Sequence, residues 1–147
     1  RKAMSFLNSL NISASGMAAQ KLRLDVAAEN IANQETTRTE GGGPYRRKMV
    51  VLHEAGENSF QKALTAAGTR QPAGVQATRI AEDETALNPV YDPTHPDADE
   101  NGYVQMPNVD LVKETIDSMS ATRSYDANIT AFNAMKLMMQ KALEIGK

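Results

Sequence analysis

The chain has 147 residues, of which 41% are hydrophobic, 23% charged and 5% aromatic, so one ordinary domain or a small domain with extensions is expected. A formal net charge of -2 gives no general attraction to nucleic acid or to anionic membranes. The sequence contains no cysteine, which excludes disulfides and thiolate metal sites. We expect neither a membrane span nor a cleavable signal peptide, so action outside the cytoplasm would need another export route.

The segment from about Ser5 to Asn33 has no proline and repeats its apolar residues at helical spacing, which predicts one long helix. Gly16 is expected to be a mild weakness in that helix. One face carries a seven-residue repeat that is typical of a coiled-coil seam: Leu10, Met17, Leu24 and Ile31. A second apolar group lies on nearly the opposite face: Ile12, Ala19, Leu22 and Val26. Two opposed stripes indicate contacts on both sides of the helix.

The segment from about Gln34 to Pro107 holds all six prolines and most of the glycines. Short strands are expected between its turn signals, at Tyr45–His53, Gly74–Ile80, Pro89–Tyr91 and Gly102–Met106. Leu64–Gly74 is expected to be a loop. The basic cluster Arg46-Arg47-Lys48 is interpreted as a solvated strand edge, because exposed edges are often protected by charge.

The segment from about Val109 to Ile145 predicts a second long helix. Asn108 is expected to be its N-cap, and Asp110 is expected to complement the helix dipole in the first turn. One apolar stripe occupies the early part: Val109, Val112, Ile116 and Met119. Beyond Arg123 the stripe moves to the far side: Tyr125, Ile129, Phe132, Met139 and Leu143.

These elements predict an α+β fold, mainly α, with two long terminal helices packed as an antiparallel coiled-coil-like pair. Residues 5–34 and 108–147 would form a discontinuous helical core domain, and residues 35–107 a small β-rich, turn-rich insertion. Two helices cannot cover four apolar stripes, and burial of one Leu or Met side chain contributes roughly 1.5–3 kcal/mol. We therefore expect other subunits to cover Leu10, Met17, Leu22, Leu24, Val26, Ile31, Val112, Ile116, Met119, Tyr125, Ile129, Phe132, Met139 and Leu143.

Two stretches also carry a family resemblance, which spans nearly the whole chain and is weakest at about residues 55–73. Residues 24–33 (LDVAAENIAN) resemble the N-terminal signature of the flagellar rod and hook family. Residues 102–110 (GYVQMPNVD) and 119–128 (MSATRSYDAN) resemble the short proximal rod members of that family. The signature positions are Asp25, Asn30, Asn33, Tyr103, Pro107, Asn108, Arg123 and Tyr125.

The resemblance implies a structural subunit without catalytic activity, whose terminal helices polymerise into the hollow helical tube of the basal-body rod. It implies a rod that crosses the periplasm and export through the flagellar type III apparatus without signal cleavage. The implied partners are copies of the chain, other rod proteins and the rod-base adaptor in the membrane ring. Asn30 and Asn33 are expected to stop the first helix, and the family implies a fixed bend there that aims the chain into the β segment.

A calcium-binding regulatory protein is the alternative, because Asp97–Gly102 matches the first half of an EF-hand loop. The match fails at the twelfth position, which is Asn108, and prolines rather than a helix precede the loop. An Asx-rich turn is the preferred interpretation. The two histidines, His53 and His95, make a poor transition-metal set, so we expect no catalytic residues, no metal and no cofactor.

Overall fold

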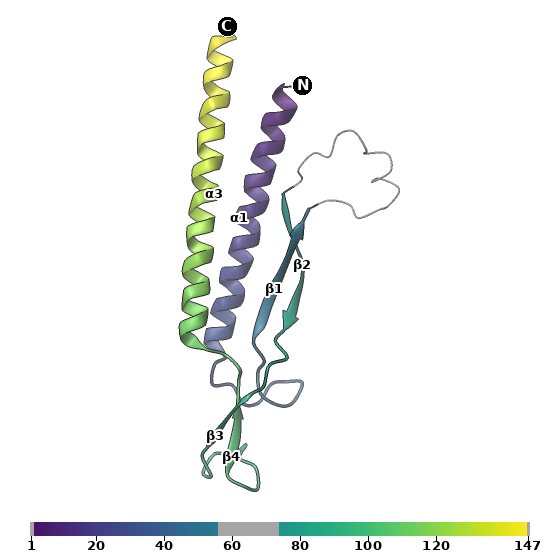
Figure 1. Cartoon of the computed structure of the whole chain (residues 1–147), viewed down its shortest axis with the longest axis vertical. Helices are drawn as coiled ribbons and strands as arrows, with labels where there is room; N and C mark the ends of the chain where they lie inside the picture. Colours follow the sequence, from purple (N-terminus) through teal and green to yellow (C-terminus); the bar gives the residue numbers. More distant parts are fainter. Residues whose placement is uncertain (1, 56–73, 147) are drawn as a thin grey trace, which may run out of the picture. The chain divides into compact units, whose positions relative to one another are not determined.

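A computed structural model describes residues 2–55 and 74–146. Two long helices stand first and last in the chain, and two small sheets lie between them in sequence (Figure 1). The mainly α architecture is therefore confirmed. The elements are α1 (Lys2–Ala32), β1 (Lys48–Glu54), β2 (Val75–Glu82), β3 (Asn88–Tyr91), β4 (Tyr103–Met106) and α3 (Leu111–Ile145). The expected loop at Leu64–Gly74 lies, apart from Gly74, outside the described residues. Within the described ranges, neither helix has an apolar stretch that would reach across a bilayer.

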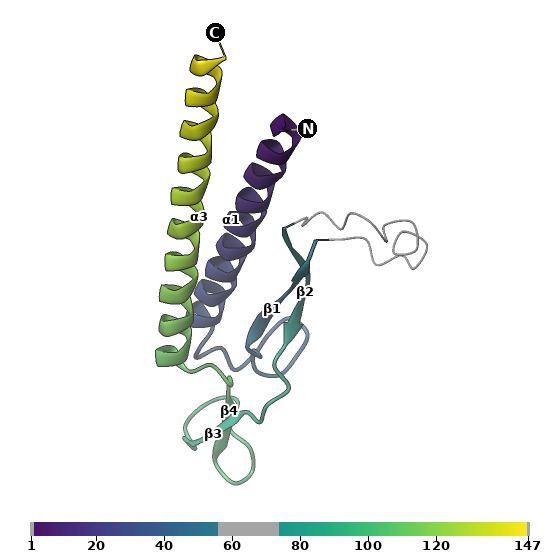
Figure 2. The same ribbon diagram turned by 45° about the horizontal axis from the view of Figure 1, so that its top comes forward.

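Both sheets are two-stranded hairpins whose bounds lie close to the expected ones. β1 pairs with β2, and the two strands run side by side in both views (Figure 1 and Figure 2). The backbone N–H of Ala55 donates to Gly74 at 2.9 Å, and that of Asp83 donates to Arg47 at 2.7 Å, which makes the pairing antiparallel. β3 pairs antiparallel with β4, with Tyr91 opposite Tyr103.

Contacts within the chain divide it into two compact units, and the division crosses both helices. Unit 1 comprises Arg1–Lys21, Leu52–Thr78 and Thr122–Lys147. Unit 2 comprises Leu22–Val51 and Arg79–Ala121. The C-terminal end of α1 and the N-terminal end of α3, which we call the inner ends of the helices, therefore share a unit with the β3–β4 hairpin. The other ends of the two helices belong to unit 1.

Small residues let other elements approach α1 closely in unit 1. A Cβ on Gly16 would lie 2.8 Å from Oδ1 of Asn128, so α3 packs directly against the helix backbone there. The hydroxyl of Ser15 accepts the backbone N–H of Val75 at 3.0 Å and donates to the carbonyl of Ile12 at 2.7 Å. Gly16 is thus a close-packing position, a role that adds to the expected weakness of a glycine within a helix.

The inner ends of the helices are capped by side chains in unit 2. The carboxylate of Asp110 accepts the backbone N–H of Val112 at 2.9 Å, so Asp110 is the N-cap of α3 and the prediction of Asn108 was wrong. At the end of α1, the side-chain amide of Asn33 donates to the carbonyl of Glu29 at 2.9 Å. This bond satisfies a carbonyl of the last turn, as expected for an asparagine that stops a helix.

Gly74 adopts a left-handed conformation with φ of 92°, and a Cβ there would lie 2.2 Å from Oγ of Ser15. Gly74→Ala should therefore lower the free energy of unfolding through both backbone strain and a clash with α1. Gly42 has φ of 80° and open space around it, so Gly42→Ala should cost only the strain of about 1–2 kcal/mol. Urea denaturation measures both effects.

Gly41→Ala is the matched control, because nothing lies within 4 Å of the added Cβ and its φ is ordinary. The expected order of destabilisation is Gly74→Ala, then Gly42→Ala, then Gly41→Ala. Equal effects at Gly74 and Gly42 would contradict the close approach of Gly74 to Ser15.

Candidate functional site

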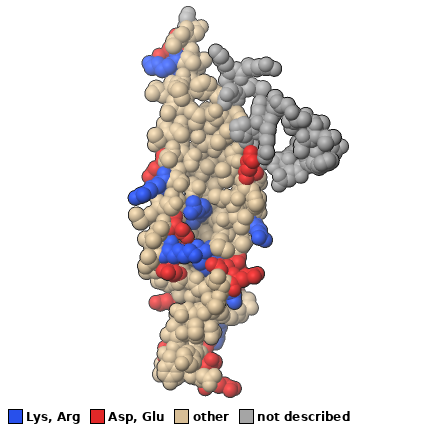
Figure 3. Space-filling model, in the orientation of Figure 1, with Lys and Arg blue, Asp and Glu red and all other residues tan. Residues whose placement is uncertain are grey.

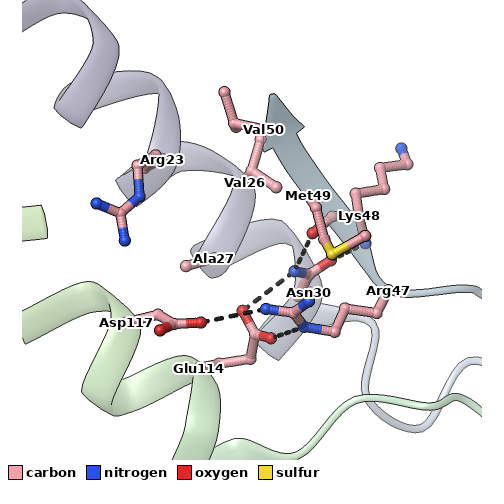
Figure 4. A pocket seen from close by; sticks show the side chains of 10 residues that line it. All are labelled: Arg23, Val26, Ala27, Asn30, Arg47, Lys48, Met49, Val50, Glu114 and Asp117. Atoms are coloured by element: carbon pink, nitrogen blue, oxygen red, sulfur yellow. Dashed lines mark hydrogen bonds and ion pairs between the residues drawn. The ribbon is translucent and has the colours of Figure 1, made fainter. Parts of the chain in front are cut away.

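The side chain of Asn30, in the last turn of α1, pairs with the backbone of β1. Its Nδ2 donates to the carbonyl of Lys48 at 2.9 Å, and its Oδ1 accepts the Lys48 backbone N–H at 2.9 Å (Figure 4). This pair of bonds reproduces what a neighbouring strand would offer to Lys48. Oδ1 also accepts the hydroxyl of Tyr45 at 2.8 Å. Asn30 is only 1% exposed, so α1 is joined to the first residue of β1 away from water.

A buried ion pair lies directly beside this amide. Arg47 donates through Nε to Oε1 of Glu114, which is 1% exposed and belongs to the first turns of α3 (Figure 4). The other carboxylate oxygen, Oε2, accepts Nδ2 of Asn30 at 3.1 Å. The guanidinium also contacts Asp117 at 3.1 Å and Asp83 at 3.5 Å. One guanidinium therefore connects β1 to α3 and to the end of β2.

The charge of Arg47 is stabilised although its side chain is only 10% exposed. Burial by itself lowers the pKa of Arg47, but the hydrogen bond and charge of Glu114, helped by Asp117 and Asp83, raise it above its ordinary value. Hydrogen bonds from the backbone and side chain of Thr85, followed by the charge of Arg47, hold the pKa of Asp83 below its usual range. The carboxylate of Asp83 is thus kept ionised beside the guanidinium.

Asn108, two residues before the N-cap of α3, makes the second side-chain bridge between backbone groups. Its Oδ1 accepts the backbone N–H of Arg47 at 2.8 Å, and its Nδ2 donates to the carbonyl of Asp83 at 2.9 Å. The start of β1 and the end of β2 are therefore joined through one amide. Together these residues form what we call the polar junction: Asn30, Tyr45, Arg47, Asp83, Asn108, Glu114 and Asp117.

The interpretation of Arg46-Arg47-Lys48 as a solvated edge was wrong. Arg47 is enclosed in the junction, and Nζ of Lys48 pairs with Glu29 at 2.6 Å. Arg46 donates to the carbonyl oxygens of Asp83 and Thr85, at 3.3 and 3.2 Å. Figure 3 shows acidic and basic side chains gathered together on one face of the molecule. These cations hold the chain together instead of protecting a free edge.

A small cavity of about 190 Å³ borders the junction, with Val26, Ala27 and Val50 among its walls (Figure 4). Every buried side-chain nitrogen or oxygen in the described part of the chain has a hydrogen-bond partner. Over the same residues, no group of three or more His, Asp or Glu side chains could hold a metal ion. The arrangement is therefore suited to fixing geometry, and its polar groups are aimed at one another.

The carboxylates of Asp97 and Asp99 in the Asp97–Gly102 loop already have hydrogen-bond partners within the chain. Oδ2 of Asp97 accepts the hydroxyl of Thr37 at 2.8 Å, and its other oxygen pairs with Arg38. Oδ1 of Asp99 accepts two backbone N–H groups, those of Asn101 and Tyr103, both at 2.9 Å. Gly102 closes the turn with φ of 81°. These bonds give the preferred Asx-rich turn, and nothing supports the calcium-binding alternative.

The expected subunit-interface residues differ in how much surface they present. Those that are more than half exposed are Val112, Ile116, Met119 and Leu143. Those that are partly buried are Leu10, Met17, Leu22, Leu24, Ile31, Tyr125, Ile129, Phe132 and Met139. Val26 is only 5% exposed, so the single chain already covers it. Among the signature positions, Asp25, Tyr103 and Arg123 are exposed and Pro107 is buried.

Comparison with known proteins matches most of both helices and part of the polar junction. The family described as flagella basal body rod protein matches residues 10–38, which contain Asn30. The family described as flagellar basal body rod FlgEFG protein C-terminal matches residues 100–145, which contain Asn108 and Glu114. The matched segments, with the helices they cover, define the class of flagellar axial rod proteins.

Curated relatives narrow this class. The flagellar basal-body rod protein FlgC of Bacillus subtilis is 51% identical, over 98% of this chain and 100% of the relative. FlgC of Salmonella typhimurium is 44% identical over the same shares, and FlgC of Borreliella burgdorferi is 41% identical over 97% and 98%. The chain belongs to the FlgC family of flagellar basal-body rod proteins and is a structural component of the rod in the basal body.

The buried Tyr45 hydroxyl leads to a pH prediction. Burial, followed by the charges of Glu29, Glu114 and Glu82, raises the pKa of Tyr45 from 10.0 to about 12. Between pH 10.0 and about pH 12, the folded chain keeps the Tyr45 proton that the unfolded chain loses. The free energy of unfolding should therefore fall as the pH rises through this range. Tyr45→Phe should weaken this alkaline loss, measured by urea denaturation at a series of pH values.

The exposed Tyr91→Phe is the matched control and should keep the alkaline loss of the unaltered chain, because its ring lies at the surface. An unchanged pH profile in Tyr45→Phe would show that the Tyr45 hydroxyl is not enclosed beside Asn30.

Proposed function

We propose that the chain builds the proximal rod by polymerising through its terminal helices into a hollow helical tube. The observation that carries this proposal is the apolar surface that α3 exposes in unit 2. Val112, Ile116 and Met119 are 67%, 59% and 54% exposed, and their spacing of four and three residues gives them one helix face. Covering each such side chain contributes roughly 1.5–3 kcal/mol, which supports a second chain on that face.

A further apolar region at the end of the same helix supports contacts with more than one neighbour. Leu137, Met138, Leu143 and Ile145 are all more than half exposed in unit 1. Contacts between two different surfaces of identical subunits need not close on themselves, and they then produce an open helical filament. The proposed rod is such a filament, with its subunits arranged around a hollow centre.

We also propose that α1 and α3 pair as antiparallel, coiled-coil-like helices. One contact within unit 1 joins Gly16 to Asn128, and one within unit 2 joins Asn30 to Glu114. The residue numbers of each pair have the same sum, as a single antiparallel register would require. On this proposal, residues 5–34 and 108–147 are the helical core and residues 35–107 the insertion. The partly buried repeat of Leu10, Met17, Leu24 and Ile31 would supply the seam.

The proposed partners follow from the family resemblance and from the names of the relatives. They are copies of the chain, other rod proteins, the rod-base adaptor in the membrane ring and the flagellar type III export apparatus. The rod would cross the periplasm. We propose no catalytic activity, cofactor, small-molecule substrate or nucleic acid, because the charged groups of the polar junction are directed at one another.

The exposed face of α3 gives the test of assembly. Ile116→Asp places a charge in the proposed contact between subunits, so swimming of a strain that lacks this chain should no longer be restored. The side chain is 59% exposed, so the free energy of unfolding should change by less than about 1 kcal/mol. Motility plates and counts of rod-bearing basal bodies by electron microscopy measure the first effect.

Ile116→Leu is the matched control, because it keeps an apolar side chain at the same exposed position. It should leave swimming nearly unchanged. Normal rods with Ile116→Asp would refute the proposed role of this face.

A further inference from the structure

The carboxylate of Glu114 is shared between two other segments of unit 2. One of its oxygens accepts Nε of Arg47, directly before β1, and the other accepts Nδ2 of Asn30 from α1 at 3.1 Å. Each bond is directional, and each oxygen has its own donor. A rotation of α3, or a shift of α1 along it, would break at least one of these bonds. Contacts between methyl and methylene groups would tolerate such movements.

Stability alone does not account for buried charges at this position. Removing a guanidinium and a carboxylate from water carries a large desolvation penalty, which their attraction only partly offsets. Neutral groups of similar volume often leave a protein as stable or make it more stable. By contrast, a network of directional bonds with every polar atom satisfied specifies one arrangement. The best-attested use of such groups is to set register.

The clamped side of α3 lies opposite its exposed apolar stripe. Glu114 and Ala121 are seven residues apart, share one face and are each 1% exposed. Val112, Ile116 and Met119 occupy the opposite face and are more than half exposed. Holding Glu114 therefore sets the direction in which this stripe points.

We propose that Arg47 and Glu114 are positioning residues that set the register and rotation of α3 against α1, and thereby aim the apolar stripe at the next subunit. This proposal rests on the rod function proposed above. In an assembly that repeats one contact many times, an angular error in each subunit accumulates along the filament. Geometry would then matter more at this site than the contribution of the ion pair to folding.

The test uses distances between spin labels in the full-length chain, which contains no cysteine of its own. Ala28 in α1 and Thr115 in α3 are exposed, so Ala28→Cys and Thr115→Cys give two sites for spin labels. Double electron–electron resonance then measures the distance between the two labels. The unaltered network should give one narrow distance distribution. The charge-free pair Arg47→Met with Glu114→Gln, which keeps an acceptor for Asn30, should broaden or shift that distribution.

Thermal unfolding of the same proteins separates positioning from stability. Arg47→Met alone should lower Tm clearly, because it leaves Glu114 buried without its cation. Adding Glu114→Gln should return Tm to within about 4 °C of the unaltered chain. The double variant should nevertheless fail to restore swimming. The exposed pair Lys141→Met with Glu144→Gln, whose charges are 3.0 Å apart in α3, is the matched control and should change neither distance nor swimming.

Three results would overturn the positioning role. They are a broad distribution in the unaltered network, an unchanged distribution in the charge-free pair, or a fall in Tm in the double variant as large as that of Arg47→Met alone. The swimming assay, and not the label distances, would reveal that the proposed rod function is wrong. In that case the labelled chain with an unaltered network would itself not restore swimming, whatever the measured distances.

Discussion

The buried contact of Asn30 and Arg47 with the Glu114 carboxylate is the constraint on which the rest of unit 2 depends. α1 ends there, β1 begins there and α3 begins there, and no one of these elements has an apolar core of its own. The buried apolar residues of this unit are few: Val26, Ala27, Tyr45, Val104, Pro107 and Ala121. With so little apolar area to define the arrangement, directional polar bonds specify it instead.

Two asparagine side chains make the hydrogen bonds to backbone groups that a neighbouring strand would make in a larger fold. Asn30 offers Lys48 a donor and an acceptor, and Asn108 does the same for Arg47 and Asp83. An amide side chain carries a donor and an acceptor on two separate atoms, so it can meet both backbone groups at once. Small hairpins with exposed edges can thus be held against helix ends without a further strand.

Helix α3 has one buried face and one exposed apolar face, and this difference connects the fold to assembly. Glu114 and Ala121 are enclosed, whereas Val112, Ile116 and Met119 remain open. The enclosed side belongs to the single chain, and on our proposal the open side belongs to the next subunit. Membership of the FlgC family is consistent with this division, because a rod component must both keep its own shape and present surface to its neighbours.

Much of the fold was predictable from local patterns in the sequence. Helical spacing without proline predicted α1 and α3 nearly to their ends, and turn residues separated the four strands. The junction was not predicted, because a charge run such as Arg46-Arg47-Lys48 is ordinarily solvated and its carboxylate partners are distant in sequence. One signal was available: Tyr45 and Arg47 alternate on one face of the chain leading into β1. The residue that caps α3 was also misjudged, since Asn108 and Asp110 are equally good N-cap types.

A cryo-EM map of the basal-body rod at side-chain resolution would show whether the Glu114 contact and the apolar stripe of α3 have the roles given above. We expect Arg47, Glu114 and Asn30 to meet within one chain, and a neighbouring chain to cover Val112, Ile116 and Met119. A map in which Arg47 pairs with a carboxylate of another subunit, or in which that stripe faces solvent along the whole rod, would contradict this expectation.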